Sequence, residues 1–199
     1  MKRIVMIMVL WLVASTAQAM TFQEGTHYKT LNAAPAKSPT VTEYFSFYHP
    51  HCYAFEPIFG SIRSQLPAGV SVQRVHVSYL GGNMAHDMSK AYATMVALGI
   101  EQQMVPEMFA QIHQQRRPPQ NHAALRQVFI NHGVDGNNFD RAFKGFSVDQ
   151  MVRKYDVSFA RSGLTSVPSV VVNNRYLVTP PRDISRAQYV ELINFLLRK

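Results

Sequence analysis

VTEYFSFYHPHCY, residues 41–53, joins a predicted strand to a predicted helix and contains the only cysteine of the 199-residue chain, Cys52. Residues 41–47 alternate in polarity and are rich in β-branched and aromatic side chains, which favours a strand. Pro50 suits the first turn of a helix. Beyond it, apolar side chains recur every three or four residues and define one helical face: Cys52, Phe55, Phe59, Ile62 and Leu66. We therefore expect Cys52 on the buried side of this helix.

The predicted helix contains a proline and is followed by a second strand. Pro57 has no N–H to bond the carbonyl of Tyr53, which predicts a kink. Leu-Pro-Ala-Gly at 66–69 ends the helix. Alternating valines then predict a strand over 70–79, closed by the glycines at 81–82.

The middle of the chain has helical rather than strand periodicity. Helix-ending glycines follow three of the predicted helices. The five helices are predicted at residues 87–98, 102–115, 123–132, 138–146 and 149–161.

Strands return only near the end of the sequence. Residues 170–172 and 176–178 flank Asn173-Asn174, a suitable tight turn. Ser185 and Gln188 form a capping box that starts a last helix. A β-α-β segment, a block of helices and a β-β-α segment together predict an α/β sheet domain interrupted by a helical insertion.

The first 19 residues have the pattern of a cleavable export signal. Lys2 and Arg3 precede an apolar run over residues 4–13, and the small residues at 17–19 predict cleavage after Ala19. The run is much shorter than the roughly 20 apolar residues that span a bilayer. We expect a signal peptide at 1–19 and no membrane span in the mature chain.

Composition limits the remaining function classes. Without Lys2 and Arg3, 18 basic and 12 acidic side chains give a net charge of +6. These charges are scattered and have no interleaved aromatic stripe, so no nucleic-acid partner is expected. A chain with one cysteine cannot form an internal disulfide, so its fold must depend on packing.

Several motifs spread along the mature chain closely resemble those of the DsbA family. The active-site region is similar, and so are short segments on both sides of the helical block. The matching segments are Glu43-Tyr44-Phe45-Ser46-Phe47-Tyr48, Pro50-His51-Cys52-Tyr53, Val75-His76-Val77, Gly81-Gly82, Ala97-Leu98-Gly99, Val128-Phe129-Ile130-Asn131 and Ser166-Val167-Pro168.

The resemblance implies a thioredoxin-like fold, a central mixed sheet flanked by helices, with a helical insertion domain. The thioredoxin-like domain would comprise 20–82 and 164–199, and the insertion 83–163. Members of the family are periplasmic thiol oxidases that act on reduced or unfolded exported polypeptides, and a quinone-linked membrane oxidase is an implied partner. No cofactor is expected.

This chain departs from the family at the residue that carries the chemistry. The family site is Cys-Pro-His-Cys, whose first cysteine is the exposed nucleophile and whose second is its buried partner. Here the first position is His49, followed by Pro50, His51 and Cys52. Disulfide donation needs a thiolate and a second thiol to resolve the mixed disulfide. We therefore expect the ordinary dithiol oxidase cycle to be lost.

The histidines and the remaining thiol have expected properties of their own. The N-terminus of the helix disfavours a positive charge at position 49, so the pKa of His49 should fall. Apolar surroundings should raise the pKa of the Cys52 thiol and block access to it. His51 stabilises the reactive thiolate in the family, but no thiolate exists at position 49 here.

Three charged residues are expected to support the site. By resemblance, Glu43 is the buried acid below the cysteine pair that assists proton movement, and Arg74 is its basic partner. Without a redox pair, we favour a simple buried ion pair for these two residues. Glu56, one helical turn after Cys52, either tunes Cys52 or is a solvated helix residue.

Val167-Pro168 is the predicted substrate-binding element. Sequence alone favours a trans peptide bond before a proline. The resemblance instead implies a cis-proline loop packed against the active-site helix. The exposed backbone of Val167 would then pair with an extended peptide as an added strand.

Three function classes therefore remain open. The first is a thiol:disulfide interchange protein by descent that retains at most single-thiol chemistry through Cys52. The second is a non-catalytic peptide-binding protein or chaperone that uses the proline loop. The third is a metal site at His49, His51 and Cys52, because imidazole and thiolate bind zinc or copper. Against it, two histidines at i and i+2 converge poorly.

Overall fold

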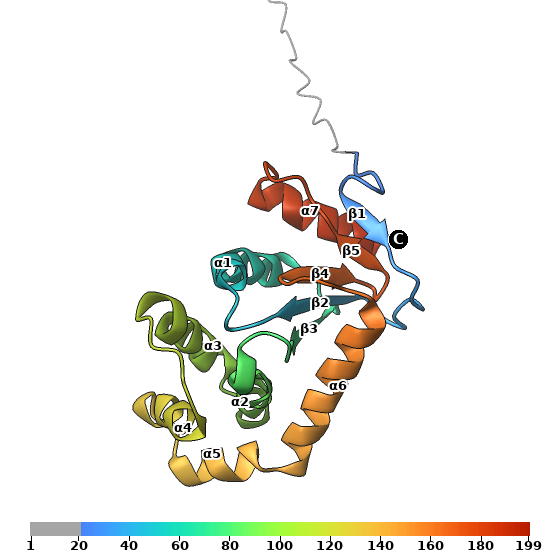
Figure 1. Ribbon diagram of the computed structural model, residues 1–199. Coiled ribbons are helices and arrows are strands. Elements are labelled where there is room, and N and C mark those ends of the chain that lie inside the picture. The colour runs from blue at the N-terminus through green and yellow to red at the C-terminus, as the bar shows by residue number, and fades with distance from the viewer. Residues whose placement is uncertain (1–20) are drawn as a thin grey trace, which may run out of the picture.

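The computed structural model describes residues 21–199 (Figure 1), so the expected signal peptide at 1–19 lies outside the described residues. The elements follow the predicted order, with helices between two groups of strands. They are β1 Tyr28–Thr30, β2 Thr40–Phe45, α1 Pro50–Gln65, β3 Ser71–His76, the 3₁₀ turn Gly82–Met84, α2 Ala85–Leu98, α3 Glu101–Phe109, the π-helical turn Ala110–Gln114, α4 His122–Asn131, α5 Gly136–Phe143, α6 Phe146–Ser162, β4 Ser169–Val172, β5 Tyr176–Val178 and α7 Arg186–Leu197.

The five strands form one mixed sheet in the order β1-β5-β4-β2-β3. β2 and β3 are parallel and are joined through α1, whereas β4 pairs antiparallel with β2 and β5, and β5 with β1. The β2–β4 register places Tyr44 opposite Ser169. The predicted α/β fold with a central mixed sheet is therefore confirmed.

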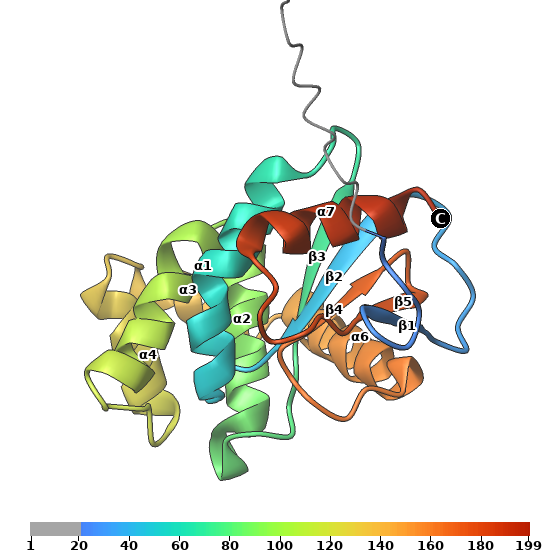
Figure 2. The ribbon, with the colours of Figure 1, turned by 90° about the horizontal axis from the view of Figure 1, so that it is seen from above.

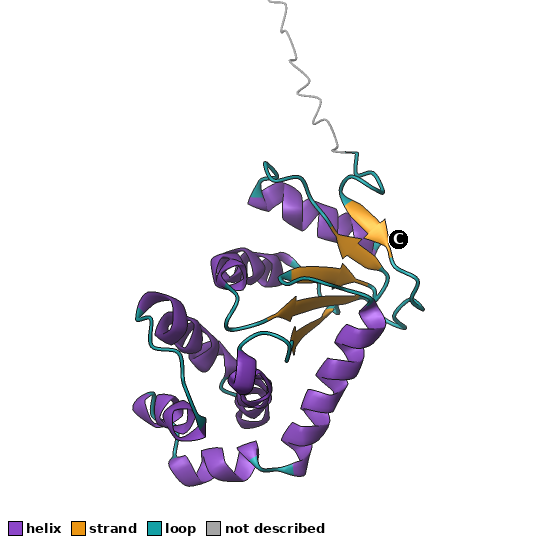
Figure 3. Cartoon of the chain, in the orientation of Figure 1, coloured by secondary structure: helices purple, strands orange, loops and turns teal. Residues whose placement is uncertain are grey.

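Helices cover both faces of the sheet (Figures 1 and 2). α1 and α7 lie together on one face, and α6 crosses the other. Figure 3 shows the remaining helices gathered beside β3, at one end of the sheet. Within residues 21–199, no helix combines the length and the apolar character needed to cross a bilayer.

Two apolar clusters hold these layers together. One lies between the sheet and the α1–α7 pair and includes Val41, Phe59 and Leu192, all fully buried. The other joins the sheet to the insertion helices through residues such as Phe45 and Phe129. Burial at about 25 cal/mol per Å² makes such clusters the main stabilising contribution in a chain without a disulfide.

Two of the helices contain an internal proline. α1 continues as an α-helix through Pro57, and the kink there stays a prediction. The helix predicted over 102–115 instead changes type: α3 contains Pro106 and ends at Phe109, and the next five residues form a π-helical turn. A proline cannot complete the helical hydrogen-bond ladder, which favours such irregular turns nearby.

The local signals at the end of the chain are confirmed. Asn173 and Asn174 have φ values of 51° and 57°, as a tight hairpin turn requires. The N–H of Arg175 donates to the carbonyl of Val172 at 3.0 Å and closes the turn. Ser185 and Gln188 form the predicted reciprocal capping box of α7.

Candidate active site

The start of α1 places His49 and Cys52 side by side. His49 is the N-cap residue with extended backbone, φ −91° and ψ 117°, and Pro50 occupies the first turn. The backbone N–H groups of Cys52 and Tyr53 both donate to the His49 carbonyl, at 3.0 and 3.2 Å. This turn brings His49 Nδ1 to 3.5 Å from Cys52 Sγ.

Cys52 is a buried and protonated thiol. It is 0% exposed, as the helical pattern predicts. Burial raises the pKa of Cys52 to about 12, although the N–H of Ser46, which donates to Sγ at 3.5 Å, favours the thiolate. Because the thiol keeps its proton at neutral pH, the S–H group can donate to the imidazole of His49.

His49 is a neutral imidazole at neutral pH. Its pKa lies below the ordinary value, chiefly because of partial burial, with smaller contributions from His51 and His113. The direction predicted from the helix N-terminus is confirmed, but burial is the main cause. His51 and Pro50 are exposed, and the His51 ring centroid lies 5.3 Å from that of His49.

Two histidines to which the sequence interpretation assigned no role hold the segment that leads into α1. His113, in the π-helical turn, donates from Nε2 to the carbonyl of Phe47 at 2.7 Å. His76, at the end of β3, accepts the N–H of Phe47 at Nε2, at 3.1 Å. The N–H and the carbonyl of Phe47, two positions before His49, are thus both bound by imidazoles. In the sequence, Pro106 is the feature that could have indicated an irregular helix near His113.

His76 is held in one protonation state. It is fully buried, and burial lowers its pKa to about 3, helped by the nearby charge of Arg74. Because Nε2 accepts from Phe47, Nδ1 carries the proton and donates to Ser89 Oγ at 2.7 Å. The fixed tautomer explains how a buried histidine is tolerated in the apolar core.

Beneath α1, the predicted ion pair is a buried triad. Arg74 Nε donates to Glu43 Oε2 at 2.6 Å, while Nη1 and Nη2 donate to the two oxygens of Glu56 at 3.0 and 2.6 Å. The Glu56 side chain is 23% exposed. It is therefore not a freely solvated residue but the second carboxylate on Arg74, and its charge also contributes to the raised pKa of Cys52.

The triad has two carboxylates and one cation, which affects Glu43. Complete burial raises the pKa of Glu43 to about 7, and repulsion from Glu56 acts in the same direction, while Arg74 opposes both. Its Oε1 is buried with no hydrogen-bond partner among the described residues. Burial alone would lower the pKa of Arg74, but the carboxylates of Glu43 and Glu56 raise it.

The proline loop differs from the expectation in one respect. The Val167–Pro168 bond is cis, as the resemblance implies. Val167, however, is only 4% exposed, because its side chain belongs to the apolar core. Val167 is therefore less exposed than expected, and its role in peptide binding stays a prediction. Continuing the β2–β4 register from Ser169 places Val167 opposite Ser46, beside the Cys52 site.

The exposed part of this loop is Thr165 and Ser166, and Pro168 is half-buried. Neither the N–H nor the carbonyl of Val167 takes part in a backbone hydrogen bond among the described residues. Backbone polar groups left unpaired near the core cost free energy, which an added strand would recover.

The third hypothesis, a metal site, receives no geometric support. Across residues 21–199, no three His, Cys, Asp or Glu side chains are arranged to hold a metal ion. His49, His51 and Cys52 do not form such a group.

A thioredoxin-like sheet, a helical insertion, a Pro-His-Cys turn at the start of α1 and a cis-proline loop beside it define a protein of the thiol-disulfide oxidoreductase class. The profile of the DSBA-like thioredoxin domain matches residues 40–189, and the chain belongs to this family. The thiol:disulfide interchange protein DsbA of Escherichia coli K12 is 31% identical over 208 residues and covers 100% of both chains. That of Dickeya dadantii is 33% identical over 208 residues and covers 99% of each.

Solved structures of DsbA proteins have a similar fold. The disulfide oxidoreductase DsbA from Proteus mirabilis has a TM-score of 0.82 and 29% identity, with 90% of this chain and 98% of that chain aligned. A cysteine-to-serine variant of the Proteus protein, solved with a non-covalently bound peptide, has a TM-score of 0.83 at 29% identity and aligns with 90% of this chain and 100% of that one.

The burial of Cys52 predicts slow alkylation of the native protein. With a pKa of about 12, about one thiol in 10⁴ is ionised at pH 8. Iodoacetamide should therefore modify native Cys52 about a thousandfold more slowly than the same residue in guanidinium chloride, measured by mass spectrometry. Equal rates in the two states would show that the thiol is accessible and ionisable.

The raised pKa of Glu43 predicts a pH-dependent stability. Because the folded protein keeps this proton up to about pH 7 and the unfolded chain loses it near 4.5, the free energy of unfolding falls as pH rises between these values. Above pH 7 the contribution is constant. At 1.36 kcal/mol per pKa unit, the fall is up to about 3 kcal/mol.

Glu43→Gln should remove the fall in the free energy of unfolding between pH 4.5 and 7, measured by urea unfolding at intervals from pH 4.5 to 8. Glu24→Gln is the matched control, because Glu24 is an exposed carboxylate and its replacement should leave the fall between pH 4.5 and 7 in place. An unchanged slope in Glu43→Gln would contradict the assignment.

Proposed function

We propose that this protein binds reduced or unfolded exported polypeptides at the proline loop, without a dithiol oxidase cycle. The observation that carries the proposal is the state of Cys52, a fully buried and protonated thiol that faces an imidazole instead of a second thiol. One thiol cannot store the two oxidising equivalents that a disulfide donor transfers. The burial of Cys52 also limits the single-thiol chemistry of the first function class.

The peptide-binding part of the site does not depend on a thiol. The unpaired backbone groups of Val167 support recognition of an extended chain through main-chain hydrogen bonds. The Proteus relative, in a form with one cysteine replaced by serine, was solved with a peptide bound non-covalently. This likeness supports peptide binding that needs no covalent step.

The proposal includes the cellular setting expected from the sequence. The leader pattern and the family resemblance favour export to the periplasm, where unfolded substrates with reduced cysteines arrive. A quinone-linked membrane oxidase would find no dithiol to reoxidise at His49 and Cys52. The proposed function therefore does not require that partner.

Peptide binding should survive removal of the thiol. Cys52→Ala should bind a fluorescein-labelled, cysteine-free extended peptide within about threefold of the unmodified protein, measured by fluorescence anisotropy, because the contacts are to the backbone. Adding the peptide should also slow hydrogen exchange at the Val167 amide. Loss of binding in Cys52→Ala, or protection confined to other regions, would contradict a thiol-independent site at this loop.

Restoring the missing thiol should restore the oxidase chemistry. His49→Cys creates Cys-Pro-His-Cys, and the side chain at position 49 already reaches the sulfur of Cys52. This variant should form a reducible internal disulfide and oxidise a fluorescent dithiol peptide, whereas His49→Ser and the unmodified protein should not. Oxidation by the unmodified protein at the rate of His49→Cys would refute the proposed loss of the dithiol cycle.

A further inference from the structure

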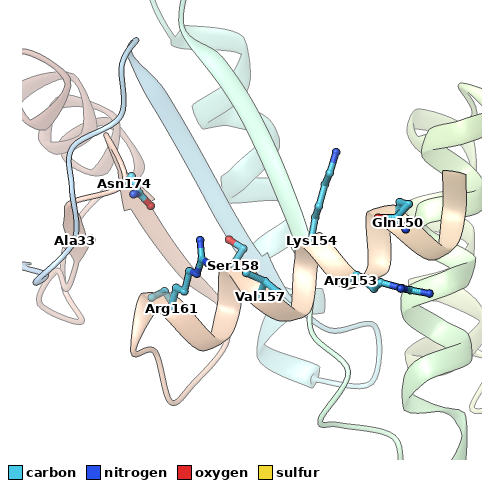
Figure 4. Close-up of a pocket in the computed structure, with 9 residues that line it drawn as sticks. Ala33, Gln150, Arg153, Lys154, Val157, Ser158, Arg161 and Asn174 are labelled. Atoms are coloured by element: carbon cyan, nitrogen blue, oxygen red, sulfur yellow. The ribbon is translucent and has the colours of Figure 1, made fainter.

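A groove of about 510 Å³ follows α6 and is lined by none of the residues at the start of α1. Figure 4 shows its residues along the helix, with Ala33 and Asn174 at one end. Because α6 and α1 lie on opposite faces of the sheet (Figures 1 and 2), this groove is separate from the site proposed above.

Three basic side chains give the groove a positive charge. Arg153, Lys154 and Arg161 line it, no acidic residue does, and none of the three forms an ion pair among the described residues. The two acids of α6 have hydrogen-bond partners outside the groove, and Arg153 also lowers the pKa of Asp149 through its charge. Asp149 accepts from Lys90 at 2.8 Å, and Asp156 accepts from Ser78 at 3.0 Å.

Two of the basic side chains lie on either side of an exposed apolar residue. In Figure 4, Lys154 and Arg161 project from the same side of α6, whereas Arg153 points toward one end of the groove. Seven residues at 1.5 Å each place Lys154 and Arg161 about 10 Å apart along the helix. Val157, an apolar residue 47% exposed, lies between them.

An extended acidic chain matches this spacing. In a polyproline II segment, side chains three residues apart project from the same side at about 9 Å. Two acidic residues at i and i+3 would therefore meet Lys154 and Arg161, and apolar residues between them would cover Val157. A flat anionic membrane fits less well, because the exposed valine and the cations share a hollow.

We propose that this groove binds an extended, acidic segment of another polypeptide, with carboxylates three residues apart and apolar residues between them. The interaction is electrostatic at both ends and apolar in the middle. The residues that line the groove include neither His49 and Cys52 nor the residues of the proline loop.

The probe is the fluorescein-labelled peptide Gly-Glu-Pro-Pro-Glu-Gly, titrated with the mature protein at low salt. Lys154→Gln with Arg161→Gln should weaken binding about tenfold, a change of about 1.4 kcal/mol. Arg182→Gln with Arg186→Gln is the matched control, because it removes the same charge from exposed residues outside the groove and should retain binding. Gly-Glu-Glu-Pro-Pro-Gly has the same charge but the wrong spacing and should bind more weakly.

Amide chemical shifts identify the surface that the peptide uses. Perturbation of Val157 and Ser158, with the resonances of His49 and Val167 unchanged, would support the groove. Equal loss of binding in both double variants, equal binding of the two peptides, or no binding at all would overturn the proposal. Binding of phosphatidylglycerol vesicles through Lys154 and Arg161 without binding of the peptide would also overturn it, in favour of a membrane surface.

Discussion

The position of the candidate site depends on one buried guanidinium group. Arg74, on β3, binds Glu43 of β2 and Glu56 of α1, so a single side chain joins two parallel strands to the helix whose first turn contains Cys52. Its planar group also lies over the ring of Phe45, 4.4 Å from the centroid. A buried cation is costly unless its partners are complete, so the triad fixes where α1 can lie on the sheet.

His49 and Cys52 form a hydrogen bond between two neutral groups, at the position where the family resemblance implies a redox pair. The fold around it is retained: the proline in the first turn, the buried thiol and the cis-proline loop all remain. In a disulfide oxidoreductase, the helix start would stabilise a thiolate. Here it faces an imidazole whose pKa is lowered, so neither partner carries charge at neutral pH. The retained scaffold and the two neutral groups are the basis of our proposal that the protein recognises peptides without a dithiol cycle.

Sequence periodicity predicted the features that depend on local chemistry. The spacing from Cys52 to Leu66 identified α1 and the burial of the thiol, and the Asn173-Asn174 turn and the Ser185 cap follow from backbone preferences. Contacts between distant segments were not predictable in the same way. His113 reaches Phe47 only because a π-helical turn shifts its register, and Glu56 joins Arg74 across two elements. The burial of Val167 likewise depends on how the core packs around it.

The two imidazoles on Phe47 have a mechanical consequence. His76 belongs to the sheet and His113 to the π-helical turn after α3, yet both bind the same residue. A shift of that turn away from β3 must stretch one of the two hydrogen bonds or drag residue 47 with it. The segment that enters α1 is thus held by both the sheet and the helical layer. A displacement of the helical layer acts on Phe47, two residues before His49.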